Sequence, residues 1–278
     1  DNRNYGLDVA QRMDQKATSN ITYSKRWPDS KNSLSINLYS NRDLLVNKKV
    51  DRSSNYFVSP TNSGSQINIS NKTLPKVSFR HGQSSLFPSS ALNKKWYNNI
   101  NWNYGFNFTK KDKNYYKSVF SDSLNSYDWQ RDENGNAIDT LFQDAGWTHT
   151  ASLNAPIKIL KHININPNIN FRSNWVNRYY DNIWVDSLSS YQKIERTGFK
   201  SRTTGNISLN ANSKLYGLFA IPVGPIKVSR HVASPSIGFS WTPDFSKPIL
   251  GYDLGYVDNY ADLSTGEIIK HDKFAGTM

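Results

Sequence analysis

Hydrophobic and polar residues alternate along several stretches of this chain, and this alternation is the strongest signal in the sequence. In residues 100–108, Ile100, Trp102 and the aromatic residues after them take every second position, with Asn or Gly between them. Residues 163–171 repeat the pattern, with Ile, Pro and Phe alternating with Asn. A β-strand sends successive side chains to opposite faces, which a helix cannot do. The pattern therefore predicts strands with one apolar face and one polar face.

The same alternation predicts further strands, which have polar connections between them. The expected strands include residues 21–27, 33–38, 66–70, 75–80, 147–157, 206–212, 225–230 and 234–242. We expect roughly ten to fourteen antiparallel strands between residues 18 and 256, several of them longer than ten residues, and negligible helix. The polar connections span residues 41–64, 110–146 and 177–203, and the pair Asn134-Gly135 predicts a type I′ hairpin turn.

Strand length and the chemistry of the two faces favour a membrane barrel over a soluble sheet. Many of the runs have the length that a tilted strand needs to cross a bilayer. Within the strands the polar face is Asn, Ser, Thr and Gly, which suits a hydrated lumen, and charges collect in the connections. Aromatic residues near strand ends suit the membrane interfaces, namely Trp27, Trp147, Trp175 and Trp241. We predict an all-β fold, part of an antiparallel transmembrane β-barrel.

This interpretation predicts which residues share a face. The even positions from Ile100 to Phe108 and the odd positions from Ile163 to Phe171 should lie on the same side of the sheet. No composition shift divides the 278 residues, so we expect residues 1–278 to be part of one barrel domain. The polar, charged ends of the chain lead us to expect a piece of a longer polypeptide.

Composition removes several classes of function. The chain has no cysteine, which excludes disulfides and thiolate metal sites within it. It contains no P-loop, no nucleophile elbow and no paired metal-binding histidines, so we expect no catalytic residue, no metal and no cofactor. The run Asp132-x-Asn134-x-Asn136 resembles the start of a calcium loop, but Ala137 and Gln143 stand where that loop needs Gly and Glu.

The net charge of +12 has several readings. Nucleic-acid binding would favour clusters of Lys and Arg interleaved with aromatic residues, and the basic pairs here stand at expected strand ends and in connections. We therefore expect no nucleic-acid partner. Basic residues at such positions suit contact with the phosphate groups of outer-membrane lipids.

The segment from Lys214 to Phe245 carries a distinctive set of short motifs. It contains a Lys-Leu-Tyr-Gly run, then an Arg-His-x-x-x-Pro-Ser run and a Pro-Asp-Phe turn. These runs resemble the barrel of the LPS-assembly protein LptD family, in a divergent branch. The resemblance covers most of residues 18–256, and its signature residues are Tyr216, Gly217, Arg230, His231, Pro235, Ser236, Pro243, Asp244 and Phe245.

The resemblance implies a function and partners. It implies an outer-membrane translocon of a Gram-negative bacterium that inserts lipopolysaccharide into the outer leaflet, without enzymatic activity. It also implies an LptE-like plug lipoprotein in the lumen and periplasmic bridge proteins that deliver lipopolysaccharide. This chain departs from the family pattern because we find no N-terminal jelly-roll segment, no cysteines and no barrel-closing strands. For the signature residues we expect a structural role. The resemblance does not identify the residues that bind substrate.

Two alternatives remain open on the sequence alone. One is another outer-membrane barrel, such as a porin or a plugged nutrient transporter. The other is a soluble, basic β protein that binds carbohydrate through exposed aromatic residues.

Overall fold

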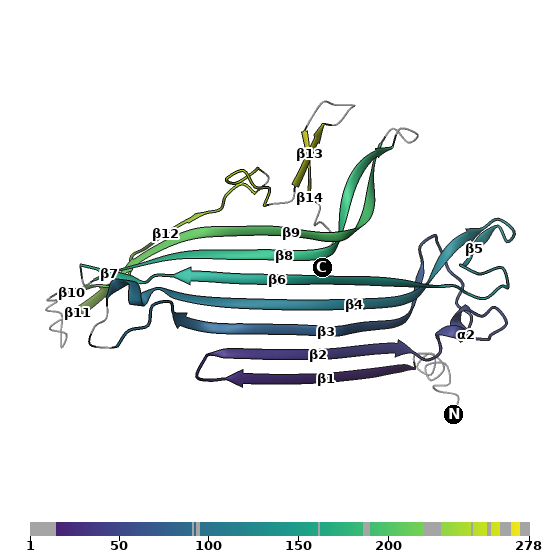
Figure 1. The fold of residues 1–278 in the computed structure, drawn as a ribbon, viewed down its shortest axis with the longest axis horizontal. Helices are drawn as coiled ribbons and strands as arrows, with labels where there is room; N and C mark the ends of the chain where they lie inside the picture. The colour runs from purple at the N-terminus through teal and green to yellow at the C-terminus, as the bar shows by residue number, and fades with distance from the viewer. Residues whose placement is uncertain are drawn as a thin grey trace. The chain divides into compact units, whose positions relative to one another are not determined.

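Antiparallel β-strands make up most of the computed structural model (Figure 1). The structure describes residues 15–90, 92, 95–160, 162–185, 190–219, 229–245, 247–254, 257–261 and 268–272. No helix in these ranges is long and apolar enough to cross a membrane. The strands that fill most of these ranges confirm the all-β fold class, and twelve of the fourteen strands found there lie between residues 16 and 241.

The largest sheet contains ten strands and follows the order β1-β2-β3-β4-β6-β8-β9-β12, with β5 paired to β4 and β7 paired to β8. Smaller two-stranded sheets are formed by β10 with β11 and by β13 with β14. The strand bounds are β1 Lys16–Trp27, β2 Asn32–Asp43, β3 Gln66–Ser85, β4 Asn101–Ser121, β5 Ser126–Trp129, β6 Asp139–Asn154, β7 Ile157–Ile159, β8 Ile163–Val185, β9 Ser190–Ser213, β10 Leu215–Phe219, β11 Ser229–Ala233, β12 Ser236–Trp241, β13 Val257–Ala261 and β14 Ile268–Asp272. The helices named in the described residues are short, namely α2 (Val46–Val50) and η2 (Trp96–Asn99).

Several strands are longer than the sequence predicts. The expected connection 110–146 is largely strand, since β4 continues to Ser121 and β6 begins at Asp139. The expected connection 177–203 is also largely strand, since β8 continues to Val185 and β9 begins at Ser190. Charged residues there face oppositely charged partners across β8 and β9: Arg178 pairs with Glu195, and Asp181 lies 3.7 Å from Arg196. Such cross-strand pairs stabilise a strand whose pattern is not apolar. Similarly, residues 66–70 and 75–80 belong to the single strand β3.

Other expectations about connections have mixed outcomes. Residues 44–65 do form a connection, which contains α2. The chain reverses at residues 131–137, where Arg131 bridges to Ala137. The backbone N–H of Gly135 donates to the Asp132 carbonyl, and Gly135 has a φ of 80°. A type I′ turn would need a positive φ at Asn134 as well, so the predicted turn type is wrong. Of the strand expected at 225–230, residues 225–228 lie outside the described residues.

The chain forms two compact units that share strands. One unit comprises Asp1–Lys25, Leu34–Ser78 and Asn107–Gly146, and the other comprises Arg26–Ser33, Phe79–Phe106 and Trp147–Met278. β1 to β4 and β6 contribute residues to both.

The first unit has a small core beneath the 44–65 connection. Val46 and Val50 of α2 are buried with Trp129 of β5, whose side chain is 2% exposed. The Trp129 indole donates to the Val58 carbonyl at 2.8 Å, and the Ser118 hydroxyl donates to the Asn62 carbonyl at 2.7 Å. These hydrogen bonds hold the connection against β4 and β5.

An ionic cluster borders this core. The Asp128 carboxylate lies 2.7 Å from Arg52 and 2.9 Å from Arg131, and its side chain is 7% exposed. Burial alone would raise the pKa of Asp128, but hydrogen bonds from Arg131, from the Trp129 backbone N–H and from Arg52 outweigh burial and hold the pKa below its usual value. Arg131 also donates to the Val50 carbonyl, so the cluster ties β5 to α2.

Candidate functional site: a two-faced sheet

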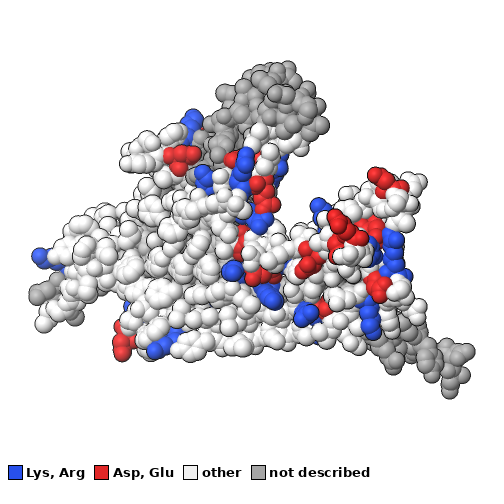
Figure 2. Space-filling view, turned by 45° about the vertical axis from the view of Figure 1, so that its right-hand side comes forward, with Lys and Arg blue, Asp and Glu red and all other residues white. Residues whose placement is uncertain are grey.

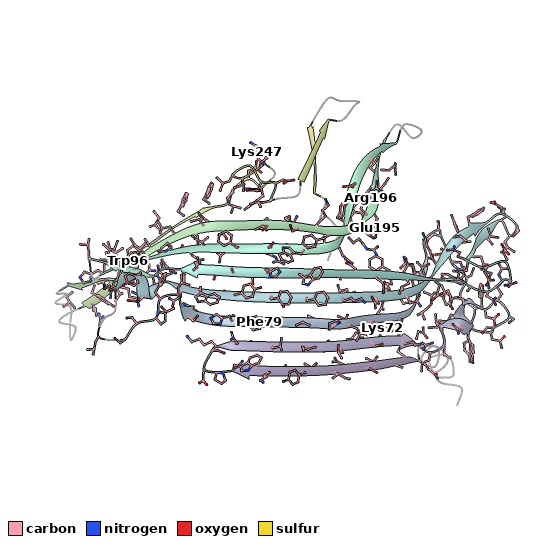
Figure 3. All side chains as sticks on the ribbon, in the orientation of Figure 1. Lys72, Phe79, Trp96, Glu195, Arg196 and Lys247 are labelled. Carbon is pink, nitrogen blue, oxygen red and sulfur yellow. The ribbon has the colours of Figure 1, made fainter. Side chains whose placement is uncertain are left out.

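A row of rings follows one face of the second unit. The Tyr104 hydroxyl lies 2.8 Å from Nδ1 of His149, and the centres of the His149 and Trp175 rings are 4.4 Å apart. Phe106 and Phe199 extend the row, with ring centres 5.1 Å from His149 and 5.6 Å from Trp175. Figure 3 shows rings along these strands and labels Phe79, whose ring lies 6.3 Å from that of Tyr104. The row crosses four strands, β4, β6, β8 and β9, and we call it the aromatic face.

This row confirms the predicted facing of the strands. Tyr104 belongs to the even set of β4, and Trp175 continues the odd positions of β8 beyond Phe171. Both contact His149, so the two sets lie on the same side of the sheet. The register agrees across β8, β9 and β12, where Ile169 is opposite Ile207 and Ile207 is opposite Trp241.

The other face is polar and is held together by hydrogen bonds between side chains. Asn103 donates to Ser152 at 2.6 Å, and Thr148 donates to Asn174 at 3.1 Å. In the β8–β9 ladder, asparagines meet directly: Asn164 lies opposite Asn212, Asn170 lies opposite Asn206, and each pair is hydrogen-bonded. We call this side the asparagine face. Its groups are uncharged donors and acceptors, which suit water or sugar hydroxyls.

Three neighbouring strands, β4, β6 and β8, each contain a stretch without charged residues. β4 has none from Asn101 to Thr109, β6 has none from Ala145 to Asn154, and β8 has none from Ile163 to Phe171. These stretches are of the length that a strand needs to cross a hydrocarbon layer. On the side drawn in Figure 2, charged side chains gather in clusters and leave a broad uncharged area beside them.

A groove of about 470 Å³ lies on the asparagine face, where β4, β6, β8 and β9 meet. Its lining includes Asn103, Ser152 and Asn170, and Arg172 is its one charged residue. The Arg172 Nε donates to Asn174 at 3.3 Å. Farther along β8, the side-chain oxygens of Asn166 and Asn168 are buried, and no donor in the described residues reaches them. The groove thus combines neutral polar groups with one positive charge.

An apolar pocket of about 230 Å³ lies beside this groove. Ile169, Phe171 and Ile207 form its floor on the aromatic face of β8 and β9. Phe245 and Leu254, from the connection that follows β12, complete its lining. Groove and pocket share the lining residues Asn170, Phe171, Thr204, Gly205 and Asn206.

The nine signature residues do not form one cluster. Tyr216, Gly217, Arg230 and His231 lie together on the β10–β11 hairpin, where Gly217 is opposite His231. The Arg230 guanidinium lies over the Tyr216 ring, 4.6 Å from its centre, which is a cation–π contact between the two strands of the hairpin.

The remaining signature residues flank β12. Pro235 precedes the strand, with its carbonyl accepting from the Ser213 N–H at 3.1 Å, and Ser236 is the first strand residue. The strand ends at Trp241, just before Thr242-Pro243, as the missing N–H of proline predicts. The Asp244 carbonyl accepts from the Lys247 N–H at 3.2 Å. Phe245 contributes to the apolar pocket, as an anchor of the turn would.

Sequence reasoning missed the residues that make the groove. The residues Asn103, Asn170, Arg172 and Asn206 were visible only as members of the polar faces of their strands. The pairing order β4-β6-β8-β9, which brings them together, depends on contacts between distant segments. No group of three or more His, Asp or Glu residues that could hold a metal ion occurs in the described part of the chain.

Comparison with known proteins gives one match. The family model described as LptD protein matches residues 1–278, the full length of the chain. No curated protein and no solved structure matches.

Proposed function

Since this chain belongs to the LptD protein family, we propose that it forms part of the outer-membrane barrel that inserts lipopolysaccharide into the outer leaflet. The family acts in lipopolysaccharide transport and assembly at the outer membrane of Gram-negative bacteria and is not a family of enzymes. The proposal for this chain concerns the finer steps: where the lipid runs and which partners deliver it.

The observation that carries the proposal is the neutral, two-faced belt of β4, β6, β8 and β9. One face presents aromatic and aliphatic side chains of the kind that border hydrocarbon, such as Phe106 and Ile165. The other presents hydrogen-bonded asparagines that can exchange their partners for sugar hydroxyls. A barrel wall of this kind separates the sugar part of an amphiphile from the surrounding acyl chains without any chemical step.

Two kinds of partner follow from this proposal. An LptE-like plug lipoprotein would face the asparagine face from within the lumen, where neutral polar contacts favour a wet interface. Periplasmic bridge proteins would deliver lipopolysaccharide, and residues 1–278 would all belong to one barrel domain.

Depletion of the protein in its own bacterium tests the proposal. We expect newly made lipopolysaccharide to stop reaching the cell surface, as measured by pulse labelling and surface accessibility, while an unrelated outer-membrane barrel still assembles normally. Normal surface delivery in depleted cells would contradict the proposed function.

A further inference from the structure

β12 pairs with only the last part of the outer edge of β9, and we call the point at which this pairing stops the interruption. β12 pairs with β9 as far as Trp241 opposite Ile207. The next backbone contact recorded along this edge is the Thr203 N–H donating to the Leu254 carbonyl at 2.8 Å. Between these two points lie β9 residues 204–206, and the connection from Thr242 to Leu254 leaves the ladder. From residue 206 back to its first residue, β9 therefore has an outer edge beside which β12 does not run.

The polar groove and the apolar pocket meet at this interruption. Thr242 lines the groove, and the next residue, Pro243, lines the pocket. Gly205 borders both and lies opposite Phe171 on β8. A Cβ atom at Gly205 would stand 2.6 Å from the Asn170 carbonyl oxygen, so any larger residue there would clash with the backbone of β8. A molecule at the interruption can therefore contact both faces of the sheet.

The two sides offer different chemistry. The groove provides asparagine and threonine side chains and the guanidinium of Arg172, which suits a phosphate group because its donors form a planar fork. The pocket is lined by Ile169, Ile207 and Phe245 and presents almost no polar surface, which suits a hydrocarbon chain. No single sugar or fatty acid uses both sides, but an amphiphile does.

We propose that this interruption, between Trp241 and Leu254 beside Gly205, is a binding site for a phosphorylated glycolipid. Its phosphosugar headgroup lies in the groove near Arg172, and one acyl chain enters the pocket against Ile169 and Phe245. The proposal rests on the proposed function, since it identifies where lipopolysaccharide would contact this part of the wall. It also gives Phe245, Ile249 and Leu254, which follow β12, a role in covering the acyl chain.

Site-specific photo-crosslinking in living cells tests the site in the intact protein. A benzoylphenylalanine at Phe171, which borders both groove and pocket, should form an adduct that antibodies to lipopolysaccharide detect. The same probe at Phe239 is the control, because Phe239 lies on the aromatic face of β12, is 64% exposed and lines neither cavity. Equal adduct at both positions would mean general contact with membrane lipid and would overturn the proposal.

Two further variants test the two arms of the site. Arg172→Gln removes the charge, and Ile169→Trp fills the pocket; each should lower the Phe171 adduct about tenfold, the change expected when one charge-assisted hydrogen bond or one well-buried group is lost. Ile165→Trp is the matched control, since Ile165 lies on the same face of β8 opposite Ala211 and lines neither cavity. The amount of adduct is divided by the amount of folded protein, which is measured from the change in gel mobility on heating. Poor assembly therefore cannot be mistaken for lost binding.

The outcomes separate this inference from the proposed function. The proposed site would be wrong if Arg172→Gln and Ile169→Trp left the amount of adduct unchanged. It would also be wrong if the adduct formed with phospholipid alone. Absence of a lipopolysaccharide adduct in cells whose export depends on the protein would overturn the site and leave the function standing. Export that continues without the protein would contradict the function itself.

Discussion

Phe106 and Asn107 are neighbours on β4 whose side chains leave the sheet on opposite sides. Phe106 lies in the aromatic row, with its ring 5.1 Å from that of His149. The Asn107 side-chain oxygen accepts a hydrogen bond from Ser78 at 2.8 Å on the asparagine face. Because the two residues are adjacent along the strand, their positions differ mainly in the face of the sheet that each side chain occupies.

Replacing each of these residues with arginine measures the polarity of the two faces. Phe106→Arg should lower the free energy of unfolding by about 2–4 kcal/mol, because the charge would face hydrocarbon near the middle of the neutral stretch. Asn107→Arg should cost about 1 kcal/mol, the value of the lost hydrogen bond, since its charge can stay hydrated. Urea unfolding in lipid vesicles provides both values. Equal costs would mean that the two faces have the same environment.

Asp128 gives the 44–65 connection a dependence on pH. Its pKa is lowered in the folded protein by the Arg131 and Arg52 contacts and the Trp129 N–H. The stabilisation is therefore present above the pKa of an unfolded aspartate, about 3.9, and is lost as the pH falls through the lower folded value. Below that range we expect α2 to detach from β5.

Asp128→Asn should remove this acid step and weaken the connection at neutral pH by about 1.5–3 kcal/mol, the value of hydrogen bonds to a charged group. Pulsed hydrogen exchange of α2 amides, after incubation at each pH, measures both effects. Asp122→Asn, in an exposed turn of the same hairpin, is the control and should behave as the unmodified protein. An acid step that persists in Asp128→Asn would assign it to another group.

Among the elements, the strands within the neutral belt were predictable and their extensions were not. The two faces of residues 100–108 and 163–171 follow from alternation alone, because a period of two has only one interpretation in a pleated strand. The outer halves of β8 and β9 lack that pattern and depend on partners such as Glu195 for Arg178, which only the fold brings together. For the same reason the groove could not be located, since Asn103 and Asn206 meet only through the strand order.

The connection after β12 is the element for which a structural role remains our prediction. Pro243→Ala or Asp244→Ala should reduce the amount of folded barrel in the outer membrane, because pairing would no longer be stopped after Trp241 and the turn would lose support. Lipopolysaccharide export should fall only in proportion. Quantifying folded protein and surface lipopolysaccharide in the same cells checks this. If the variants assembled normally but failed to export lipopolysaccharide, these residues would act in transport and the structural role would be wrong.

At the scale of the molecule, the two compact units are joined by strands that belong to both. β1 to β4 and β6 each contribute residues to the two units. Two independently folding domains would instead be connected by a linker with few contacts.

We therefore expect one cooperative unfolding transition for residues 1–278 in urea. Tryptophan fluorescence, which reports on Trp129 in one unit and Trp175 in the other, should change over the same urea range as the far-ultraviolet circular dichroism. Trp129 is the one tryptophan of the first unit in the sequence, so a Trp129→Phe variant reports on the second unit alone, and a variant with Phe at the other seven tryptophan positions reports on the first. Midpoints that differ between these variants would show that the units unfold independently and would contradict a single domain.

The pairing of asparagine with asparagine between β8 and β9 leaves the register of these strands poorly encoded. If β9 slipped by two residues, Asn164 would meet Asn210 instead of Asn212, and Asn168 would meet Asn206, so each face would keep its character. Features outside this repeat distinguish the correct alignment, namely Gly205 opposite Phe171, the bulge between Val176 and Arg178, and the ion pair of Arg178 with Glu195. Repetition of this kind makes misaligned hairpins nearly as favourable as the native one during assembly. The chain would then depend on a template that sets the first pair of strands, rather than on its own sequence, to choose between them.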